Sequence, residues 1–195
     1  MVEKNPDEGA GSCKRAEPVD RVVLTGFRAS GKSVVGRKLA HSLAYRFLDT
    51  DEELAAEMGC GIEEYVRRHG WPAFRELERS LLVRLAGGHR LVIATGGGSV
   101  MHGKEWRRLR KNSLVVWLRA EAETIRQRLQ DDVRSAAQRP SLTGGDMLAE
   151  VDRMLAEREP LYRQGSDVVI DTTGRPPETV VSLIKDLVAR TGERD

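Results

Sequence analysis

The residues of this chain best suited to chemistry lie between Gly26 and Ser33, where the sequence reads Gly-Phe-Arg-Ala-Ser-Gly-Lys-Ser. The spacing G-x-x-x-x-G-K-S is typical of a turn whose backbone N–H groups surround phosphates. Lys32 is expected to reach the β- and γ-phosphates, and the Ser33 hydroxyl to bind Mg²⁺. A β-branched run at 21–25 and helical spacing after Ser33 place the turn before a helix N-terminus, which favours anions. This context favours binding of a nucleoside triphosphate over a chance glycine-rich turn.

Two acidic residues follow the next predicted strand, at 47–48. Asp49 and Asp51 are two positions apart, so in an extended chain their side chains point the same way. Beside a phosphate loop, one carboxylate can hold the water shell of Mg²⁺ and the other can orient or deprotonate an attacking hydroxyl. The structural alternative is a helix N-cap, since Asp or Thr50 before an acidic helical start is ordinary capping chemistry. Two acids at this spacing favour a functional role over a purely structural one. One of Asp49, Thr50 and Asp51 is expected to cap the helix as well.

Two further features point to a small anionic ligand. Residues 96–98 are three successive glycines after the strand predicted at 91–94. A turn with positive φ would need one glycine, whereas three let a ligand lie against the backbone. Arg75 falls near the start of a helix opened by Pro72, where the helix dipole disfavours a cation. Its position therefore suggests an anionic partner.

The pattern of the chain predicts the scaffold that positions these residues. Strands are predicted at 22–25, 47–48, 91–94, 114–118 and 167–170, and helices at 33–44, 52–58, 62–69, 72–86, 103–111, 121–132, 147–158 and 177–190. Alternating strands and helices indicate a doubly wound α/β fold, with a parallel five-stranded sheet and helices on both faces. Ligands of such sheets bind at the carboxyl ends of the strands, where the residues above lie.

The chain is expected to divide into a short extension and one domain. Residues 1–20 contain acids, Pro and Gly without an apolar run, and are predicted to be a disordered N-terminal extension rather than a secretory signal. Residues 21–195 are predicted to form a single domain that carries the phosphate loop. The polar stretch 133–146 interrupts the pattern with Pro140 and two glycines, and is predicted to be a mobile lid.

Composition limits the class of protein. A chain of 195 residues, 39% hydrophobic and 32% charged, is long enough for one α/β domain with a core. The net charge of +2 gives little reason to expect nucleic acid or a membrane as partner, and the basic run at 104–111 is interpreted as a solvated helix face. Cys13 and Cys60 form neither a zinc motif nor a disulfide framework, so a reducing cytoplasm is expected. The chain is predicted to be a monomer with small-molecule substrates.

Together these motifs resemble those of the shikimate kinase family, small P-loop kinases of aromatic amino-acid biosynthesis. The resemblance extends from about residue 21 to 190. It implies that residues 21–195 are a single P-loop kinase domain, in which about 51–80 is the substrate-binding segment. It rests on motifs in the same order along the chain: Gly26 to Ser33, Leu48-Asp49-Thr50-Asp51, Phe74-Arg75-x-x-Glu78, Gly96-Gly97-Gly98, Arg139-Pro140-x-Leu142 and Arg158-x-Pro160-Leu161-Tyr162. The phosphate loop alone is compatible with any P-loop NTPase, whereas the other motifs together are compatible with far fewer families.

The resemblance implies a role for each motif residue. Ser33 would bind Mg²⁺ directly and Asp49 would lie in its outer shell. Asp51 would poise the attacking hydroxyl of shikimate, while Lys32 and, from the lid, Arg139 would act on the transferred phosphate. The implied shikimate contacts are Asp51, Arg75, Gly96, Gly97, Gly98 and Arg158. The implied ATP contacts are Ala29, Ser30, Gly31, Lys32, Ser33, Val34, Arg128, Arg139 and Arg175.

The implied reaction is Mg²⁺-dependent transfer of phosphate from ATP to the 3-hydroxyl of shikimate. Two alternatives stay open: another small-molecule P-loop kinase such as gluconate kinase, and a non-catalytic nucleotide-binding module. The triple glycine and the Phe74-Arg75 pair speak against the first, and the presence of both Lys32 and Asp51 against the second. Two positions depart from the family pattern. Ala29 stands where glycine is common, so its methyl group is tolerable only if the backbone is not left-handed, and Ser141 stands where leucine is usual.

Overall fold

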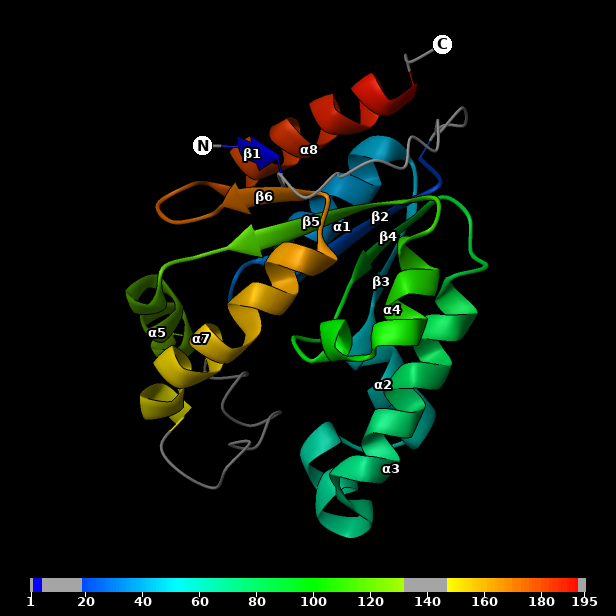
Figure 1. Cartoon of the computed structure of the whole chain (residues 1–195), viewed down its shortest axis with the longest axis vertical. Coiled ribbons are helices and arrows are strands. Elements are labelled where there is room, and N and C mark those ends of the chain that lie inside the picture. The colour runs from blue at the N-terminus through cyan, green and yellow to red at the C-terminus, as the bar shows by residue number, and fades with distance from the viewer. Residues whose placement is uncertain (1, 5–18, 132–146, 193–195) are drawn as a thin grey trace.

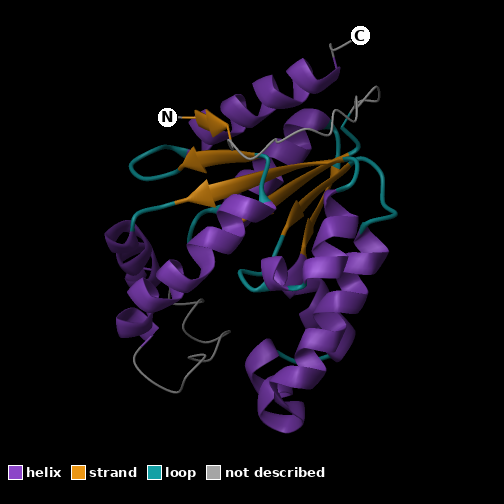
Figure 2. Ribbon diagram, viewed as in Figure 1, coloured by secondary structure: helices purple, strands orange, loops and turns teal. Residues whose placement is uncertain are grey.

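The computed structural model describes residues 2–4, 19–131 and 147–192. Its strands form a six-stranded sheet in the order β1-β6-β5-β2-β4-β3 (Figures 1 and 2). The strands are β1 (Val2–Lys4), β2 (Arg21–Thr25), β3 (Arg46–Asp49), β4 (Leu91–Ala94), β5 (Ser113–Arg119) and β6 (Val168–Asp171). Strands β2 to β6 all pair in parallel, which confirms the predicted parallel five-stranded sheet.

Strand β1 is an addition that the sequence pattern does not predict. It pairs antiparallel with β6, with Val2 opposite Ile170 and Lys4 opposite Val168. It lies within the segment expected to be a disordered extension, so residues 2–4 depart from that expectation. Residues 1 and 5–18 lie outside the described part of the chain. Pairing to a sheet edge uses backbone groups alone, which is why a polar segment can form a strand without an apolar pattern.

Helices cover both faces of the sheet, as predicted. They are α1 (Lys32–Leu43), α2 (Thr50–Met58), α3 (Ile62–Leu85), α4 (Gly103–Arg110), α5 (Ala122–Asp131), α7 (Met147–Gly165) and α8 (Pro177–Gly192), with a 3₁₀ turn η1 (Ser99–Met101). Helices α1 and α8 pack on one face, and α2, α3 and α4 pack on the other (Figure 1). Within the described ranges, no helix is both long and apolar enough to cross a membrane.

The central strand β2 shows how the sequence builds a core on each face. Val22 and Leu24 belong to the apolar cluster under α1 and α8, whereas Val23 belongs to the cluster under α2, α3 and α4. Successive side chains of a strand point to opposite faces. A strand buried on both faces therefore needs a continuous apolar run, which is what the segment after Arg21 provides.

Helix α3 contains a break that separates the two helices predicted at 62–69 and 72–86. Gly70 has φ 79° and ψ 163° inside the element, a conformation that glycine adopts readily and other residues do not. Pro72 then suits the first turn of the second half, because its fixed φ is helical and its missing N–H has no partner to lose. The second half thus begins close to Arg75, and it carries Phe74 into the core.

The segments that carry the sequence motifs meet at one edge of the sheet. Because strands β2 to β6 are parallel, the loops that follow them leave from neighbouring carboxyl ends. From β2 the chain continues to β3 and β4 on one side, and later to β5 and β6 on the other. Such a change of direction opens a crevice in which α/β sheets bind their ligands.

Candidate active site

The loop between β2 and α1 has a backbone that favours glycine. Gly26 and Gly31 have φ values of 136° and 96°, and a Cβ at Gly26 would lie 2.4 Å from the carbonyl oxygen of Leu118. Ala29 has a φ of 57° and is left-handed, which costs an L-amino acid about 1–2 kcal/mol. The backbone at Ala29 is therefore left-handed, contrary to the conformation in which its methyl group would be tolerable, and the residue strains the loop.

Lys32 is the first residue of α1, and its side chain folds back over the loop. Its Nζ donates to the carbonyl oxygens of Gly26 and Phe27 at 3.0 and 2.7 Å, and lies 3.5 Å from Ser30 Oγ. The residue is 8% exposed. The ammonium group is thus buried among polar atoms of the loop rather than in the apolar core, and its charge lies within the loop.

Ser33 and Asp49 are in direct contact between α1 and β3. Ser33 Oγ donates to Asp49 Oδ2 at 2.6 Å, and Asp49 Oδ1 accepts from the backbone N–H of Asp51 at 3.0 Å. The second contact makes Asp49 the N-cap of α2. The Asp49 carboxylate therefore caps α2 and also accepts a hydrogen bond from the Ser33 hydroxyl, so the capping role and the role beside the phosphate loop do not exclude each other. The neighbouring Asp51 is left to face the pocket described below.

The oxygen donors of Ser33 and Asp49 suit Mg²⁺. A hydroxyl and a carboxylate lie side by side next to the phosphate loop, and Mg²⁺ uses few protein ligands because it keeps waters and takes phosphate oxygens. In the portion of the chain that is described, no group of three or more His, Cys, Asp or Glu side chains could hold a metal by itself. A metal ion here would therefore take its remaining ligands from a nucleotide and water.

The three glycines after β4 make room for side chains of the site. Gly98 has a φ of −95°, and none of the three has the positive φ that would require glycine. An added Cβ would lie 2.7 Å from Asp51 Oδ1 at Gly96 and 2.6 Å from Arg75 Nη1 at Gly98. At Gly97 it would lie 3.3 Å from the Tyr162 hydroxyl oxygen and 3.4 Å from Arg158 Nη1. Each glycine thus admits one side chain that the sequence assigns to substrate binding.

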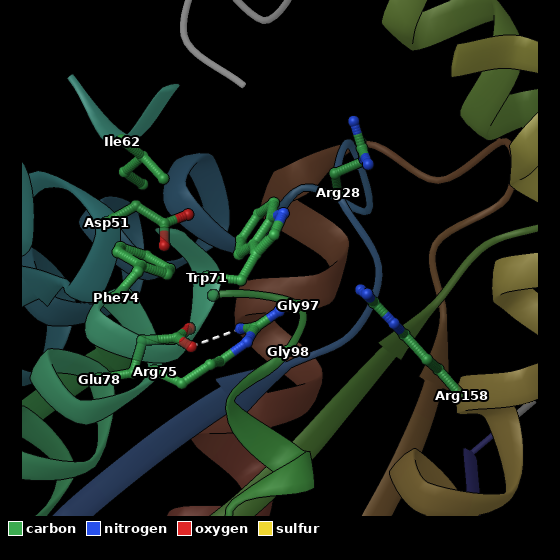
Figure 3. A pocket seen from close by; sticks show the side chains of 11 residues that line it. Arg28, Asp51, Ile62, Trp71, Phe74, Arg75, Glu78, Gly97, Gly98 and Arg158 are labelled. Carbon is green, nitrogen blue, oxygen red and sulfur yellow. Dashed lines mark hydrogen bonds and ion pairs between the residues drawn. The ribbon is translucent and has the colours of Figure 1, made fainter. Parts of the chain in front are cut away.

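These side chains line one pocket, which we call the acceptor pocket (Figure 3). Its lining residues are Arg28, Asp51, Ile62, Trp71, Phe74, Arg75, Glu78, Gly96, Gly97, Gly98 and Arg158. Figure 3 shows Asp51 and the side chains of α3 on one side, with Arg28 and Arg158 on the other. A ligand in this pocket would meet a carboxylate, several cations and an aromatic wall. Such a lining suits a small anionic molecule that carries hydroxyl groups.

Arg75 is held from three directions. Its Nη1 donates to Glu78 Oε2 on the same helix, its guanidinium carbon lies 5.0 Å from the centre of the Trp71 ring, and the backbone of Gly98 packs against its nitrogens. Glu78 is buried, at 4% exposure, and a buried carboxylate is stable only when it is paired. These contacts together hold Arg75 at the wall of the pocket, where its charge faces a bound ligand.

Arg158 enters the pocket from α7, where Tyr162 lies one turn later. The Tyr162 hydroxyl donates to the carbonyl oxygen of Gly97 at 2.6 Å, and the residue is completely buried. Burial raises the pKa of Tyr162 to about 12, although Arg158 and Arg28 act in the opposite direction. The hydroxyl therefore remains protonated and ties the triple glycine to α7.

Replacing Tyr162 with phenylalanine is expected to lower stability by about 1 kcal/mol, because the Gly97 carbonyl loses its donor. The wild-type protein should also lose stability as the pH rises through the range between about 10 and 12. The unfolded tyrosine ionises near pH 10, so between about pH 10 and 12 the folded state binds more protons than the unfolded state. Tyr162 therefore contributes its full stabilisation only below about pH 10, and this stabilisation is lost as the pH rises through that range. Melting temperatures of both proteins from about pH 8 upwards check this. An equal alkaline loss in Tyr162→Phe would contradict it.

Arg128 braces the phosphate loop against the loop after β6. Its Nη1 donates to the Ala29 carbonyl at 3.1 Å and its Nη2 to the Thr172 carbonyl at 2.9 Å. The hydroxyl of Thr172 lies 3.2 Å from the Ser30 carbonyl oxygen, and the Arg175 N–H donates back to the carbonyl of Thr172 at 3.3 Å. Arg128 thus borders the phosphate loop, whereas Arg175 belongs to the loop after β6. An adenine contact for either arginine stays a prediction.

The structure brings most of the residues singled out from the sequence to one place. Those assigned to the acceptor line one pocket, and the oxygen donors assigned to Mg²⁺ touch each other at the end of the phosphate loop. Val34, expected among the ATP contacts, is 52% exposed in the first turn of α1. Arg139 and the lid predicted at 133–146 lie outside the described residues.

Several side chains of the site are not assigned from the sequence. Glu78 and Tyr162 stand inside the motifs that carry the family resemblance, and those motifs are the signal by which they could have been found. Arg28 occupies a variable position of the phosphate loop, and Trp71 precedes the helix start at Pro72. Both line the acceptor pocket only because of the way the chain folds around it.

Comparison with known proteins agrees with this geometry. A sequence model of the shikimate kinase family matches residues 28–189. A shikimate kinase of Oleidesulfovibrio alaskensis is 41% identical over 174 residues, covering 89% of this chain and 100% of the relative. A shikimate kinase 2 of Yersinia enterocolitica is 39% identical over 168 residues, covering 86% and 95% respectively.

Solved structures show the same relationship. Shikimate kinase from Acinetobacter baumannii, solved in complex with shikimate, superposes with a TM-score of 0.83 at 29% identity, covering 91% of this chain and 97% of that one. Shikimate kinase from Aquifex aeolicus gives a TM-score of 0.70 at 30% identity, covering 87% and 96%. A gluconokinase from Sinorhizobium meliloti, with a TM-score of 0.54 at 19% identity, shares the fold alone. The sequence motifs, the arrangement of the site and these matches together show that the chain belongs to the shikimate kinase family.

Proposed function

We propose that the protein transfers the γ-phosphoryl group of ATP to the 3-hydroxyl of shikimate in the presence of Mg²⁺. The observation that carries this proposal is the acceptor pocket, in which Asp51, Arg75 and Arg158 meet beside the phosphate loop. Membership of the family, and a relative solved with shikimate bound, support the same acceptor.

The acceptor side of the pocket matches a hydroxylated carboxylic acid. Arg75 and Arg158 supply the charge that binds the carboxylate of shikimate, and guanidinium groups suit this geometry because they donate two parallel hydrogen bonds. Asp51 accepts a hydrogen bond from the attacking hydroxyl. As the new bond between phosphorus and the hydroxyl oxygen forms, Asp51 takes the proton that the oxygen releases.

The phosphate side stabilises the charge that moves during transfer. Backbone N–H groups of the loop at 26–33 hold the phosphates, and Lys32 turns from the loop carbonyls toward the bond between the β- and γ-phosphates. That bond breaks as the new one forms, and ADP leaves with the bridging oxygen. Ser33 and Asp49 would hold Mg²⁺, which neutralises phosphate charge when bound. We assign Arg139 to the transferred phosphate, and Arg128 and Arg175 to the adenine.

A coupled assay of ADP release tests the proposal and its alternatives. With Mg²⁺ and ATP, turnover is expected with shikimate and absent with gluconate or without an acceptor, and EDTA should abolish it. Turnover with gluconate alone would identify a different small-molecule kinase. Nucleotide binding without turnover on any acceptor would indicate a non-catalytic module. The monomeric state and the cytoplasmic location stay predictions. Light scattering after size-exclusion chromatography tests the monomeric state.

The triple glycine allows the roles of Asp51 and Arg75 to be separated. Gly96→Ala is expected to displace the Asp51 carboxylate and lower kcat about tenfold. Gly98→Ala is expected to displace the Arg75 guanidinium and raise the shikimate KM about tenfold. Each change corresponds to about 1.4 kcal/mol. The contacted atoms are ends of side chains, so both variants should fold. Gly61→Ala is the control, because nothing lies within 4 Å of a Cβ there. Identical kinetic changes in the two site variants would contradict the separation.

A further inference from the structure

His102 is a buried side chain next to the acceptor pocket that no motif of the sequence includes. It lies between η1 and α4 and is 6% exposed. Its Nε2 is 3.1 Å from Glu78 Oε2, and the same carboxylate oxygen accepts from Arg75 Nη1. Three side chains thus form a continuous chain from the start of α4, through α3, to the pocket.

We propose that His102 is a positioning residue for the acceptor: it fixes Glu78, and through Glu78 it fixes Arg75 against the carboxylate of the substrate. The inference rests on the proposed function, because binding of an acceptor carboxylate is its readout. His102 does not line the pocket, so its effect must pass through the other two side chains.

The packing explains why Glu78 needs a second donor. Arg75 and Glu78 are three residues apart on one helix, and such a pair restrains its side chains only weakly by itself. Glu78 is 4% exposed, so water cannot satisfy its oxygens and protein donors must do so. His102 comes from a different element and approaches the oxygen that Arg75 uses. Its contact therefore restricts the ion pair to one arrangement, which aims the remaining donors of Arg75 at the pocket.

The same geometry assigns the proton of His102. A carboxylate paired with an arginine only accepts hydrogen bonds, so Nε2 must carry the hydrogen in this contact. A glutamine side chain can place its amide nitrogen near the position of Nε2 and can donate in the same way. An asparagine amide reaches only the position of Nδ1 and falls short of Glu78. The two amides differ by one methylene group and therefore make a matched pair.

Steady-state kinetics of His102→Asn and His102→Gln test the proposal. The asparagine variant is expected to raise the shikimate KM about tenfold, which corresponds to about 1.4 kcal/mol, with kcat and the KM for ATP within about twofold of wild type. The glutamine variant should restore the shikimate KM to within about twofold. If the asparagine variant does not fold, His102→Ser, which is also too short, replaces it. Equal shikimate KM values for the short variant and the glutamine variant would overturn the proposal.

A double-mutant cycle shows whether the effect passes through Arg75. In an Arg75→Leu background, His102→Asn should change the shikimate KM no further. A further tenfold rise in the shikimate KM would show that the effect of His102 does not pass through Arg75. Trp106→Phe is the structural control. Trp106 is buried on α4 and donates to the Gly165 carbonyl at 3.0 Å, so its loss should lower the melting temperature without changing the shikimate KM. A wild-type protein inactive on shikimate would overturn both the function and this inference, whereas an active one with indistinguishable variants would overturn the inference alone.

Discussion

Lys32→Ala is expected to lower kcat by at least about a hundredfold, equivalent to about 2.7 kcal/mol of transition-state stabilisation. The ammonium group lies in the phosphate loop, with 3.0 and 2.7 Å contacts to the Gly26 and Phe27 carbonyls. When a phosphate replaces those carbonyls, the hydrogen bond becomes charged on both sides, and it strengthens as negative charge moves onto the bridging oxygen. The measurement is single-turnover phosphorylation of shikimate at saturating substrates.

The controls for this variant separate chemistry from folding. Lys38→Ala removes the same side chain from the same helix, where it is exposed and paired with Glu178 at 2.8 Å, and it should leave kcat unchanged. Lys32→Met keeps the length of the side chain and should be as inactive as Lys32→Ala. Circular dichroism should show that Lys32→Ala and Lys32→Met are folded. A residual kcat above about a tenth of wild type, a loss below about 1.4 kcal/mol, would show that the assigned role of Lys32 is wrong.

Asp51→Asn is expected to lower kcat by about a hundredfold or more, within the range that a general base contributes, while the affinity for ATP changes less than about twofold. The substitution keeps the shape of the side chain beside Gly96 but removes the charge that orients the hydroxyl and accepts its proton. Isothermal titration with ATP and rapid-quench kinetics with shikimate measure the two quantities. A weakening of ATP binding that matches the loss of kcat would place Asp51 at the nucleotide instead.

Asp49→Asn provides the comparison for Asp51. Asparagine caps helices as well as aspartate does, so α2 should persist, while the carboxylate that contacts Ser33 is lost. The expected result is a higher Mg²⁺ concentration for half-maximal activity. Glu52→Gln makes the same acid-to-amide change on an exposed side chain paired with Arg37, and should have no effect. Equal shifts of the Mg²⁺ dependence in the Asp49 and Asp51 variants would remove the distinction between the two carboxylates.

The elements and the phosphate loop could be predicted because the signals that form them are local. Strand β2 is read from its apolar run, and the start of α1 from the glycine spacing before Lys32. The break in α3 was expected from the separation of two helical patterns, and the structure places it at Gly70. In each case a residue's own conformational preference, or that of its immediate neighbours, decides the outcome.

The contacts within the site were predicted only in part. The sequence indicates that Asp49 and Asp51 share one edge of the sheet, but not that Asp49 caps α2 while it holds Ser33. It indicates a glycine platform, but not that Gly98 makes room for Arg75. It also leaves open whether Ala29 is left-handed. These facts depend on side chains whose positions are set by distant segments, so no local pattern contains them.

The sequence by itself determined the succession of the five parallel strands and their helices along the chain, the position of the phosphate loop and the set of charged residues available for an anionic acceptor. Spacing and residue type suffice for each of these. Only the tertiary structure decided which of those charges support one another. Glu78 pairs with Arg75 within one helix, but His102 reaches the same oxygen from 24 residues away, and β1 joins β6 across almost the whole chain. Burial makes such contacts matter, since a carboxylate removed from water must find its donors wherever the fold brings them.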